Sequence, residues 1–336
     1  MSKTAVVLFN LGGPDSLQAV RPFLFNLFYD RAILTMPNPF RWLLAQFISM
    51  ARHKKAQGIY ERMGGKSPLL ENTVAQKLSL EKALSPNYKV FIAMRYWHPF
   101  TDDAVDAVKA YNPDQVVLLP LYPHFSTTTT GSSVQEWYRV AKSKAFSKPT
   151  RSICCFPLNE SFIQAHVNSL WPVYEKAQAF GHVRVLFSAH SLPQKIIHGG
   201  DPYQWQTEQC AEKIIETLEK QHTVRLDWRV CYQSKVGPVP WLQPTLDSEI
   251  DKAAKDGVAL VVVPISFVSD HSETLVELDM DFLEKAKSLG VPFYGRVPSL
   301  GTHDFLVKAL CQLAENHQSP NRLCPKEFCG CFLKEK

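Results

Sequence analysis

The feature that most constrains the fold is a series of short, almost uninterrupted apolar runs that alternate with helical patterns. These runs are rich in Val, Leu and Ile, and they fall at residues 5–10, 89–94, 115–119, 183–188, 225–232 and 259–263. Strands that are apolar on both faces are typical of parallel sheets covered by helices on both sides. The sequence therefore predicts an α/β protein with doubly wound, Rossmann-like parallel sheets.

An internal echo predicts that this architecture is duplicated. Residues 116–122 resemble residues 260–266, because each stretch is a buried strand that ends in proline before a polar loop with His and Ser or Thr. The strand and loop at 8–14 are answered in the same way at 186–193. We therefore expect two similar domains with a cleft between them, and the cleft is the expected ligand site.

The chain has 336 residues, which suits two such domains. We place an N-terminal α/β domain at 1–150, with an apolar lip at 33–52. A C-terminal α/β domain follows at 151–315, and a Cys-containing tail occupies 316–336.

Composition and charge narrow the function classes. The formal net charge is +5, but Lys and Arg are scattered rather than grouped, which argues against nucleic acid. The longest apolar run, residues 258–267, is about half the roughly 20 residues that span a bilayer. The apolar start is too short for a secretory signal, so we expect a cytoplasmic protein whose eight cysteines are reduced thiols or metal ligands.

The segment from Ile33 to Met50 has two interpretations. Pro37 and Pro39 interrupt it, and apolar residues at helical spacing follow. The resulting amphipathic helix could face the core, or it could form an exposed lip that receives an apolar substrate or touches the inner face of the membrane.

The densest polar cluster is Ser269–Asp279, directly after a predicted strand. If a helix begins near His271, Glu273 and Glu277 share one face, which suits a proton relay or a divalent cation. The alternative is a helix start enriched in acids by the helix dipole. His190 ends another predicted strand, so it is expected at the same edge of its sheet as Glu273.

Two further groups suit an aromatic ligand with carboxylates. Arg52, Tyr60 and Ser67 offer donors for a carboxylate next to the apolar lip. Ser234 and Trp241 lie in a proline-flanked loop, where the indole could stack on a flat ring or simply pack in the core. The glycine spacing around these segments matches no phosphate-binding fingerprint, so no nucleotide is expected.

Taken in order, these segments resemble the ferrochelatase family from Leu8 to about Leu313. The motifs that carry the resemblance are Asn10–Pro14, Tyr60 with Gly64-Gly65 and Ser67-Pro68, Arg95-Tyr96 with His98-Pro99, Tyr122-Pro123 with Gly131–Ser133, Phe187–Pro193, Gly200–Tyr203, Gln233–Leu242 and Ser269–Asp279. The resemblance implies a lyase that inserts Fe²⁺, as substrate, into protoporphyrin IX to form protohaem.

The resemblance also implies roles for individual residues. His190 matches the histidine at the macrocycle centre that takes pyrrole protons or meets the metal. Glu273 matches its acidic partner at the metal, while Glu277 and His271 continue a polar path. The positions that match the porphyrin pocket are Leu11, Arg52, Tyr60, Ser67, Arg95, Tyr122, Ser234 and Trp241.

Some members of the family bind a [2Fe–2S] cluster through C-terminal cysteines and one distant cysteine. Here Cys324, Cys329 and Cys331 form the C-terminal group, with Cys154 or Cys155, preferably Cys155, as the distant ligand. Their spacing departs from standard metal fingerprints, and a tail without a cluster is the alternative.

Other functions on the same scaffold stay open at this point. They are a coproporphyrin ferrochelatase, a cobalt or nickel chelatase, and a tetrapyrrole carrier without catalysis. The expected partners are a porphyrin and ferrous iron, with the protein a monomer or a homodimer.

Overall fold

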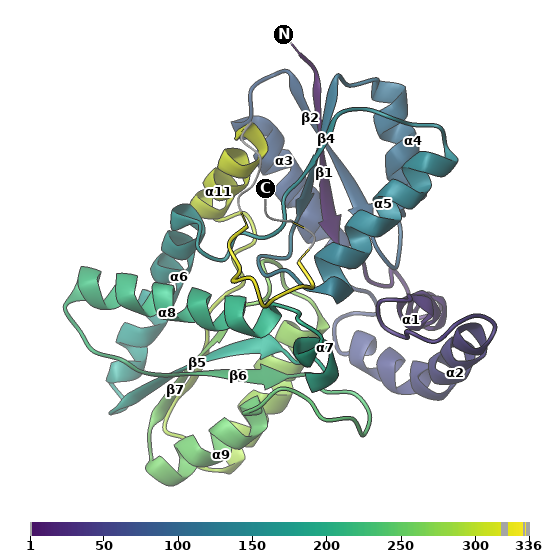
Figure 1. The fold of residues 1–336 in the computed structure, drawn as a ribbon. Helices are drawn as coiled ribbons and strands as arrows, with labels where there is room; N and C mark the ends of the chain where they lie inside the picture. Colours follow the sequence, from purple (N-terminus) through teal and green to yellow (C-terminus); the bar gives the residue numbers. More distant parts are fainter. Residues whose placement is uncertain (1, 317–321, 332, 334–336) are drawn as a thin grey trace. The chain divides into compact units, whose positions relative to one another are not determined.

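The computed structural model describes residues 2–316, 322–331 and 333, and it divides the chain into two compact units (Figure 1). Unit 1 comprises residues up to 155 and from 310 to 322, while unit 2 comprises 156–309 and 323–331. The tail predicted at 316–336 lies partly outside the described residues.

Unit 1 is built on a parallel sheet in the order β2-β1-β3-β4. Its elements are β1 (Thr4–Asn10), α1 (Val20–Tyr29), α2 (Phe40–Glu61), α3 (Leu69–Ala83), β2 (Tyr88–Met94), α4 (Thr101–Tyr111), β3 (Gln115–Pro120), the π-helix η1 (Thr127–Gly131), α5 (Ser132–Ser143) and β4 (Thr150–Ser152). Every residue of β1 is buried, as the continuous apolar pattern predicts for a central parallel strand.

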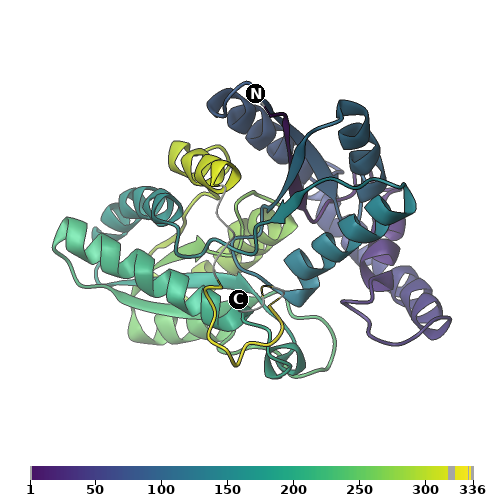
Figure 2. The ribbon, with the colours of Figure 1, turned by 45° about the horizontal axis from the view of Figure 1, so that its top comes forward.

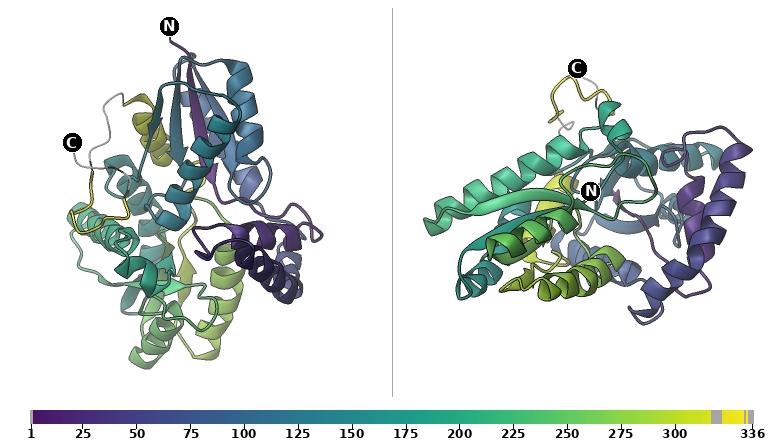
Figure 3. Two further views of the ribbon diagram at one scale, coloured as in Figure 1. Left: turned by 45° about the vertical axis from the view of Figure 1, so that its right-hand side comes forward. Right: turned by 90° about the horizontal axis from the view of Figure 1, so that it is seen from below.

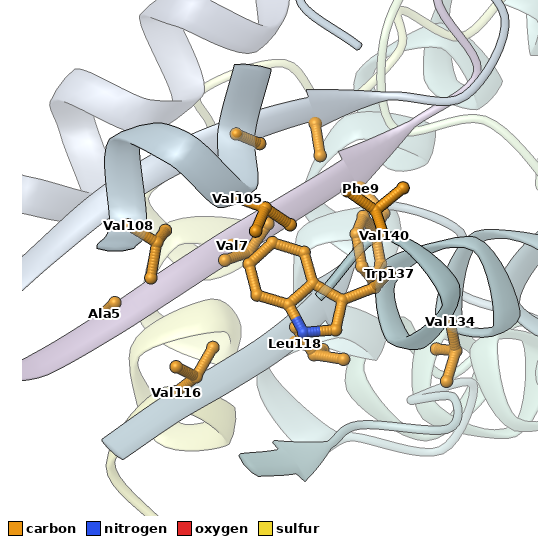
Figure 4. Close-up of a cluster of buried hydrophobic side chains, with 12 residues drawn as sticks. Ala5, Val7, Phe9, Val105, Val108, Val116, Leu118, Val134, Trp137 and Val140 are labelled. Carbon is orange, nitrogen blue, oxygen red and sulfur yellow. The ribbon is translucent and has the colours of Figure 1, made fainter. Parts of the chain in front are cut away.

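The core on one face of this sheet is closed by α4 and α5 (Figure 4). Trp137 of α5 lies over the strands, with its ring 6.3 Å from that of Phe9 in an edge-on arrangement. Val105 and Val108 of α4 complete the same cluster. Because such a core is close-packed, truncating Trp137 to Ala is expected to cost about 3–5 kcal/mol of stability.

Helices α1 and α2 lie side by side within unit 1 (Figure 2). Tyr60 near the end of α2 packs with Val20, Phe23 and Leu24 of α1. The start of α2 is different, since its large apolar side chains are exposed: Phe40, Trp42, Leu43, Phe47 and Met50. Of the two interpretations of Ile33–Met50, the structure therefore favours the exposed apolar lip.

Unit 2 repeats the topology, with a parallel sheet in the order β6-β5-β7-β8. Its elements are α6 (Glu160–Gln178), β5 (Val183–His190), α7 (Gln194–His198), α8 (Tyr203–His222), β6 (Asp227–Gln233), α9 (Leu246–Asp256), β7 (Ala259–Pro264), the π-helix η2 (Glu273–Phe282), α10 (Leu283–Ser288), β8 (Tyr294–Arg296) and α11 (Asp304–Glu315), which ends in unit 1. Helices α8 and α9 cover opposite faces of this sheet (Figure 3).

The echo seen in the sequence corresponds to matching strands. β3 and β7 occupy the same place in their sheets, and each is followed by a π-helix. The predicted α/β class with two similar doubly wound sheets is therefore confirmed. The helix expected from His271 is a π-helix instead, and it begins at Glu273.

Two short edge strands, β4 and β8, were not predicted. Each has only three residues, which is too short for a periodic pattern to stand out. Among the described helices, none combines the length and the apolar character that crossing a bilayer requires.

Candidate functional site

Three neighbouring strands of unit 2 deliver the central polar residues to one edge of their sheet. β5 ends at His190 and β6 ends at Gln233, and these two residues are register partners. β7 ends at Pro264, and the loop after it leads into η2 with Glu273 and Glu277. The carboxyl ends of parallel strands meet at the same edge, which is where open α/β sheets bind ligands.

His190 and Glu273 form a direct pair. His190 Nδ1 lies 2.8 Å from Glu273 Oε2, although the two residues are far apart in the chain. The His190 side chain is 37% exposed, so its ring can be reached by a ligand. Because Nδ1 is engaged by the carboxylate, Nε2 is the ring atom that remains for a ligand.

A serine joins the two glutamates. Ser234 Oγ lies 3.0 Å from Glu273 Oε2 and 2.6 Å from Glu277 Oε2. Its backbone has a φ of 64°, a left-handed conformation that is uncommon outside glycine. The strained turn after β6 therefore places one hydroxyl between both carboxylates.

Gln233 supports the same arrangement from the end of β6. Its Nε2 donates to the Glu273 carbonyl at 2.9 Å and to Glu277 Oε2 at 3.2 Å. Ser188 Oγ donates to Gln233 Oε1 at 2.6 Å, which fixes the orientation of the amide. Sequence reasoning gave Gln233 no role, because an amide at a strand end carries no distinct signal.

The three titratable side chains of this group, His190, Glu273 and Glu277, differ in the direction in which their pKa values are shifted. Burial opposes charge on His190, but Glu273 and Glu277 outweigh it and raise the pKa of the imidazole. Burial also opposes charge on Glu273, yet the attraction and hydrogen bond of His190 hold the pKa of this carboxyl well below its usual range. Glu277 differs, because burial and repulsion from Glu273 raise its pKa to about 7. The site thus pairs an ionised carboxylate with an acid that titrates near neutrality.

His271 is close to this group but has a different contact. Its Nδ1 accepts a hydrogen bond from the backbone N–H of Glu273 at 3.0 Å, and its ring lies edge-on to Phe267. Burial is the largest cause that lowers the pKa of this imidazole. The His271 ring thus binds the first backbone N–H of η2.

Trp241 lies in the same unit, on the loop that pairs with the segment after His190. Leu242 N donates to the Leu192 carbonyl at 3.0 Å, and Gln194 Nε2 donates to the Trp241 carbonyl at 3.2 Å. The indole N–H of Trp241 is buried and has no hydrogen-bond partner in the described part of the chain.

The other predicted pocket residues belong to unit 1. Leu11 and Tyr60 share the apolar cluster of α1 and α2. Ser67 is buried and its backbone N–H donates to the Pro14 carbonyl at 2.8 Å. A Cβ on Gly13 would overlap the Ser67 side chain, which explains the glycine. Arg52 is exposed on α2, and burial raises the pKa of the Tyr122 hydroxyl.

Arg95 already has an anionic partner in unit 1. Its guanidinium lies 3.0 Å from Asp30 Oδ2, and its Nε donates to Ser132 Oγ at 2.7 Å. The Tyr96 hydroxyl also donates to Asp30 Oδ2, at 2.8 Å, and Ser132 Oγ contacts the same oxygen. Asp30 was missed by sequence reasoning, since a single acid after an apolar helix has many ordinary explanations.

The cysteines of the tail lie in unit 2 on the segment 323–331. Cys324 and Cys331 are buried and Cys329 is exposed, while Cys155 belongs to unit 1. Gln206 Nε2 donates to Cys324 Sγ at 2.9 Å. Over the described ranges, no three His, Cys, Asp or Glu side chains form a group that could hold a metal ion.

Comparison with known proteins identifies the family to which the chain belongs. The family model described as Ferrochelatase matches residues 3–318, nearly the whole chain. The chain belongs to the ferrochelatase family. A ferrochelatase of Wolbachia sp. subsp. Drosophila simulans (strain wRi) is 53% identical over 318 residues, covering 94% of this chain and 99% of the relative.

Other ferrochelatase relatives extend the match. The ferrochelatase of Pelagibacter ubique (strain HTCC1062) is 44% identical and covers 99% of this chain and 100% of the relative. Among solved structures, SirB from Bacillus subtilis with Fe3+ has a TM-score of 0.55 at 15% identity, covering 94% of this chain and 96% of that chain. The likeness to SirB shows a shared fold and nothing further.

Proposed function

We propose that this chain is an enzyme that inserts ferrous iron into protoporphyrin IX to form protohaem, the terminal step of haem biosynthesis. Membership of the ferrochelatase family supports the reaction class. The observation that carries the proposal is the pair of His190 Nδ1 and Glu273 Oε2 at 2.8 Å, joined to Glu277 through Ser234. A non-catalytic carrier would need no such set of proton-accepting groups.

Metal insertion must remove two protons from the macrocycle. A free-base porphyrin carries two pyrrole N–H groups, and Fe²⁺ replaces both protons, which leave as 2 H⁺. In this proposal His190 Nε2 accepts a pyrrole proton while Glu273 stabilises the imidazolium that forms. Because Glu273 raises the pKa of His190, the imidazole is a stronger base than it would be alone.

Glu277 suits the second proton. With a pKa of about 7 it can accept a proton near neutral pH and release it to water. Ser234, in contact with both carboxylates, can relay between them. Before it takes up a proton, His190 Nε2 is also the atom that we propose to meet the incoming Fe²⁺ together with Glu273, since neutral imidazole and carboxylate are ordinary iron ligands. We propose that His271 helps by holding the start of η2.

The remaining predicted residues are proposed to bind the porphyrin itself. Arg52 is exposed and is suited to a propionate, as a guanidinium binds a carboxylate in a bidentate fashion. Leu11, Tyr60, Ser67 and Tyr122 are proposed as pocket lining, and Trp241 as a surface for the ring. Arg95 already forms an ion pair with Asp30. We therefore propose that it shapes the pocket wall and does not bind a propionate.

The direct test is a steady-state assay with protoporphyrin IX and Fe²⁺ or Zn²⁺. The expected result is turnover by the native protein and loss of turnover in His190→Ala with porphyrin binding retained. His182→Ala is the matched control, because His182 is in the same unit and its side chain is 66% exposed. Retained turnover in His190→Ala, or porphyrin binding without turnover in the native protein, would overturn the proposal.

The identity of the porphyrin is tested by a parallel assay with coproporphyrin III. We propose protoporphyrin as the substrate, so its kcat/KM should exceed that of coproporphyrin. The reverse order would assign the chain to coproporphyrin, and turnover only with Co²⁺ or Ni²⁺ would assign it to the alternative chelatases.

A [2Fe–2S] cluster needs four ligands, and the described residues do not provide a complete site. We assign no step of the reaction to such a cluster. The hypothesis that Cys324, Cys329, Cys331 and Cys155 bind one is tested by visible absorption and by iron and sulfide analysis of anaerobically purified protein. Colourless protein without bound iron or sulfide would reject it.

We propose a cytoplasmic location with peripheral contact at the inner face of the membrane, as a monomer or a homodimer. The exposed apolar side chains at the start of α2 support the contact: Phe40, Trp42, Leu43, Phe47 and Met50. Co-sedimentation with anionic vesicles tests it, with Phe47→Ser as the variant and Leu78→Ser as the control. Leu78 is also exposed, but it lies on α3. Equal binding by both variants would contradict the proposal.

A further inference from the structure

The edge strand β8 holds the π-helix that carries the site acids. Tyr294 and Arg296 are two residues apart, so they point to the same face of the sheet. The Tyr294 hydroxyl donates to the carbonyl of Leu278 in η2 at 3.0 Å. Both long side chains of this strand are thus directed to η2 or to its flanks.

Arg296 makes the stronger connection. Its Nε and Nη2 donate to the two oxygens of Asp279 at 2.6 and 2.7 Å, a bidentate fork. Its Nη1 donates to Asp270 Oδ1 at 3.0 Å, and Ser299 Oγ donates to the same oxygen at 2.8 Å. One guanidinium therefore ties a residue before η2 and a residue within η2 to the sheet.

The two tied aspartates bracket the catalytic segment. Asp270 precedes Glu273, and Asp279 follows Glu277. The acids of this segment thus fall into two pairs with separate partners: Asp270 and Asp279 bind Arg296, whereas Glu273 and Glu277 contact Ser234. The Arg296 side chain is only 13% exposed, so solvent screens these ion pairs weakly.

We infer that Arg296 is a positioning residue, which fixes η2 so that the Glu273 carboxylate stays against His190. The inference rests on the proposed function, because it concerns the same site. Geometry rather than charge is the essential property, since the planar guanidinium spans two carboxylates and a lysine ammonium cannot reproduce the fork. Arg296→Lys therefore removes the positioning while keeping the charge.

Arg184 provides a matched control within the same sheet. Its Nε and Nη1 bind Asp227 and Asp256 at 2.7 and 2.8 Å, and its side chain is 12% exposed. It lies near the amino end of β5, at the end of the strand opposite His190. Arg184→Lys thus removes another guanidinium that binds two aspartates, with similar burial but away from the site.

The experiment compares Arg296→Lys and Arg184→Lys by zinc insertion and by hydrogen exchange of peptides covering η2. For Arg296→Lys we expect kcat to fall about tenfold to a hundredfold, as for a slightly misplaced catalytic group, with KM for porphyrin changed by less than about twofold. The rate of backbone hydrogen exchange in η2 should increase. For Arg184→Lys we expect kcat within about twofold of the native value and unchanged exchange in η2.

Several outcomes would overturn the inference. Native kcat in Arg296→Lys would do so even with faster exchange, as would an equal loss of kcat in both variants. If Arg296→Lys does not fold, Asp279→Asn removes one charge of the fork at similar volume and must show the same pattern. If the native protein inserts no metal, the proposed function fails, while the exchange data still decide whether Arg296 fixes η2.

Discussion

His190 Nδ1 and Glu273 Oε2 are 2.8 Å apart, and the imidazole belongs to a strand end while the carboxylate belongs to a π-helix. The contact keeps Glu273 ionised and raises the pKa of His190. Replacing Glu273 with Gln keeps the shape but removes the charge that stabilises the imidazolium. We expect kcat for metal insertion to fall roughly 10²- to 10³-fold, the range for general-base catalysis.

Stopped-flow or steady-state assays with Zn²⁺ measure this loss, and Glu284→Gln is the control. Glu284 is an exposed acid on α10, just beyond η2. A Glu273→Gln variant with native kcat would contradict the role of the pair.

Protonation of Glu277 should make the rate of metal insertion depend on pH. A proton acceptor must be deprotonated to act, and burial with repulsion from Glu273 raises the pKa of Glu277 to about 7. The rate should therefore fall as the pH drops through about 7. Glu277→Gln should have a lower kcat and should lose the part of this fall that Glu277 causes, while the part caused by protonation of His190 remains. An unchanged profile would exclude Glu277 as a group that titrates in this range.

The Glu277 carboxyl also makes the stability of the fold depend on pH. This stability should fall as the pH rises, whereas the rate should fall as the pH drops. Its pKa is raised above the unfolded value of about 4.5, so the folded state holds this proton more tightly. Stability from this group is present below pH 4.5 and is lost as the pH rises through about 7. Glu277→Gln should therefore stabilise the protein at pH 8 by about 1–3 kcal/mol, and by much less at pH 4.5, as measured by urea denaturation.

Two of the three strands that build this site were predictable because they are central in the sheet. β5 and β7 are continuous apolar strands in the middle of the sheet, and their carboxyl ends place His190 and the loop that leads to Glu273 on the same side. β6 is an edge strand that contains Asp227 and Arg229, so its pattern is weaker. The sequence also indicated that Glu273 and Glu277 lie close together. The π-helical form of η2 was not predicted, since its apolar spacing does not differ clearly from that of an α-helix.

The side-chain contacts of the site residues were much harder to predict than the places of these residues in the fold. Ser234 was predicted as a residue of the porphyrin pocket, but its contacts with Glu273 and Glu277 were not predicted. Arg296 lies in a three-residue edge strand, where no pattern distinguishes it from other surface arginines. Such contacts form between side chains of elements that are far apart in the sequence. They depend on the three-dimensional arrangement of those elements, which a single sequence does not give.

A buried histidine outside the site predicts acid sensitivity. His166 on α6 is 2% exposed, and burial lowers its pKa to about 3, with His303 as a smaller cause. Below pH 6.5 the unfolded chain takes up a proton that the folded state does not, so stability falls as the pH drops from 6.5 towards 3. The loss should be about 1.4 kcal/mol at pH 5.5.

His166→Phe should remove this part of the acid sensitivity, because the ring volume is kept beside Phe162 without a titrating group. Urea midpoints at pH 7.5 and 5.5 measure the effect. His198→Phe is the control, since His198 is exposed on α7. An equal pH dependence in His166→Phe and the native protein would show that His166 is not responsible.

Asp30 predicts a large effect of a single substitution in unit 1. Its Oδ2 accepts from the Tyr96 hydroxyl and contacts the Arg95 guanidinium and Ser132, and its side chain is 5% exposed. Asp30→Asn leaves the partly buried Arg95 charge without its buried counterion, which should cost about 3–5 kcal/mol. Tyr96→Phe removes only one hydrogen bond and should cost about 1–2 kcal/mol. Urea denaturation of both variants measures the difference, and equal losses would show that Arg95 does not depend on the Asp30 charge.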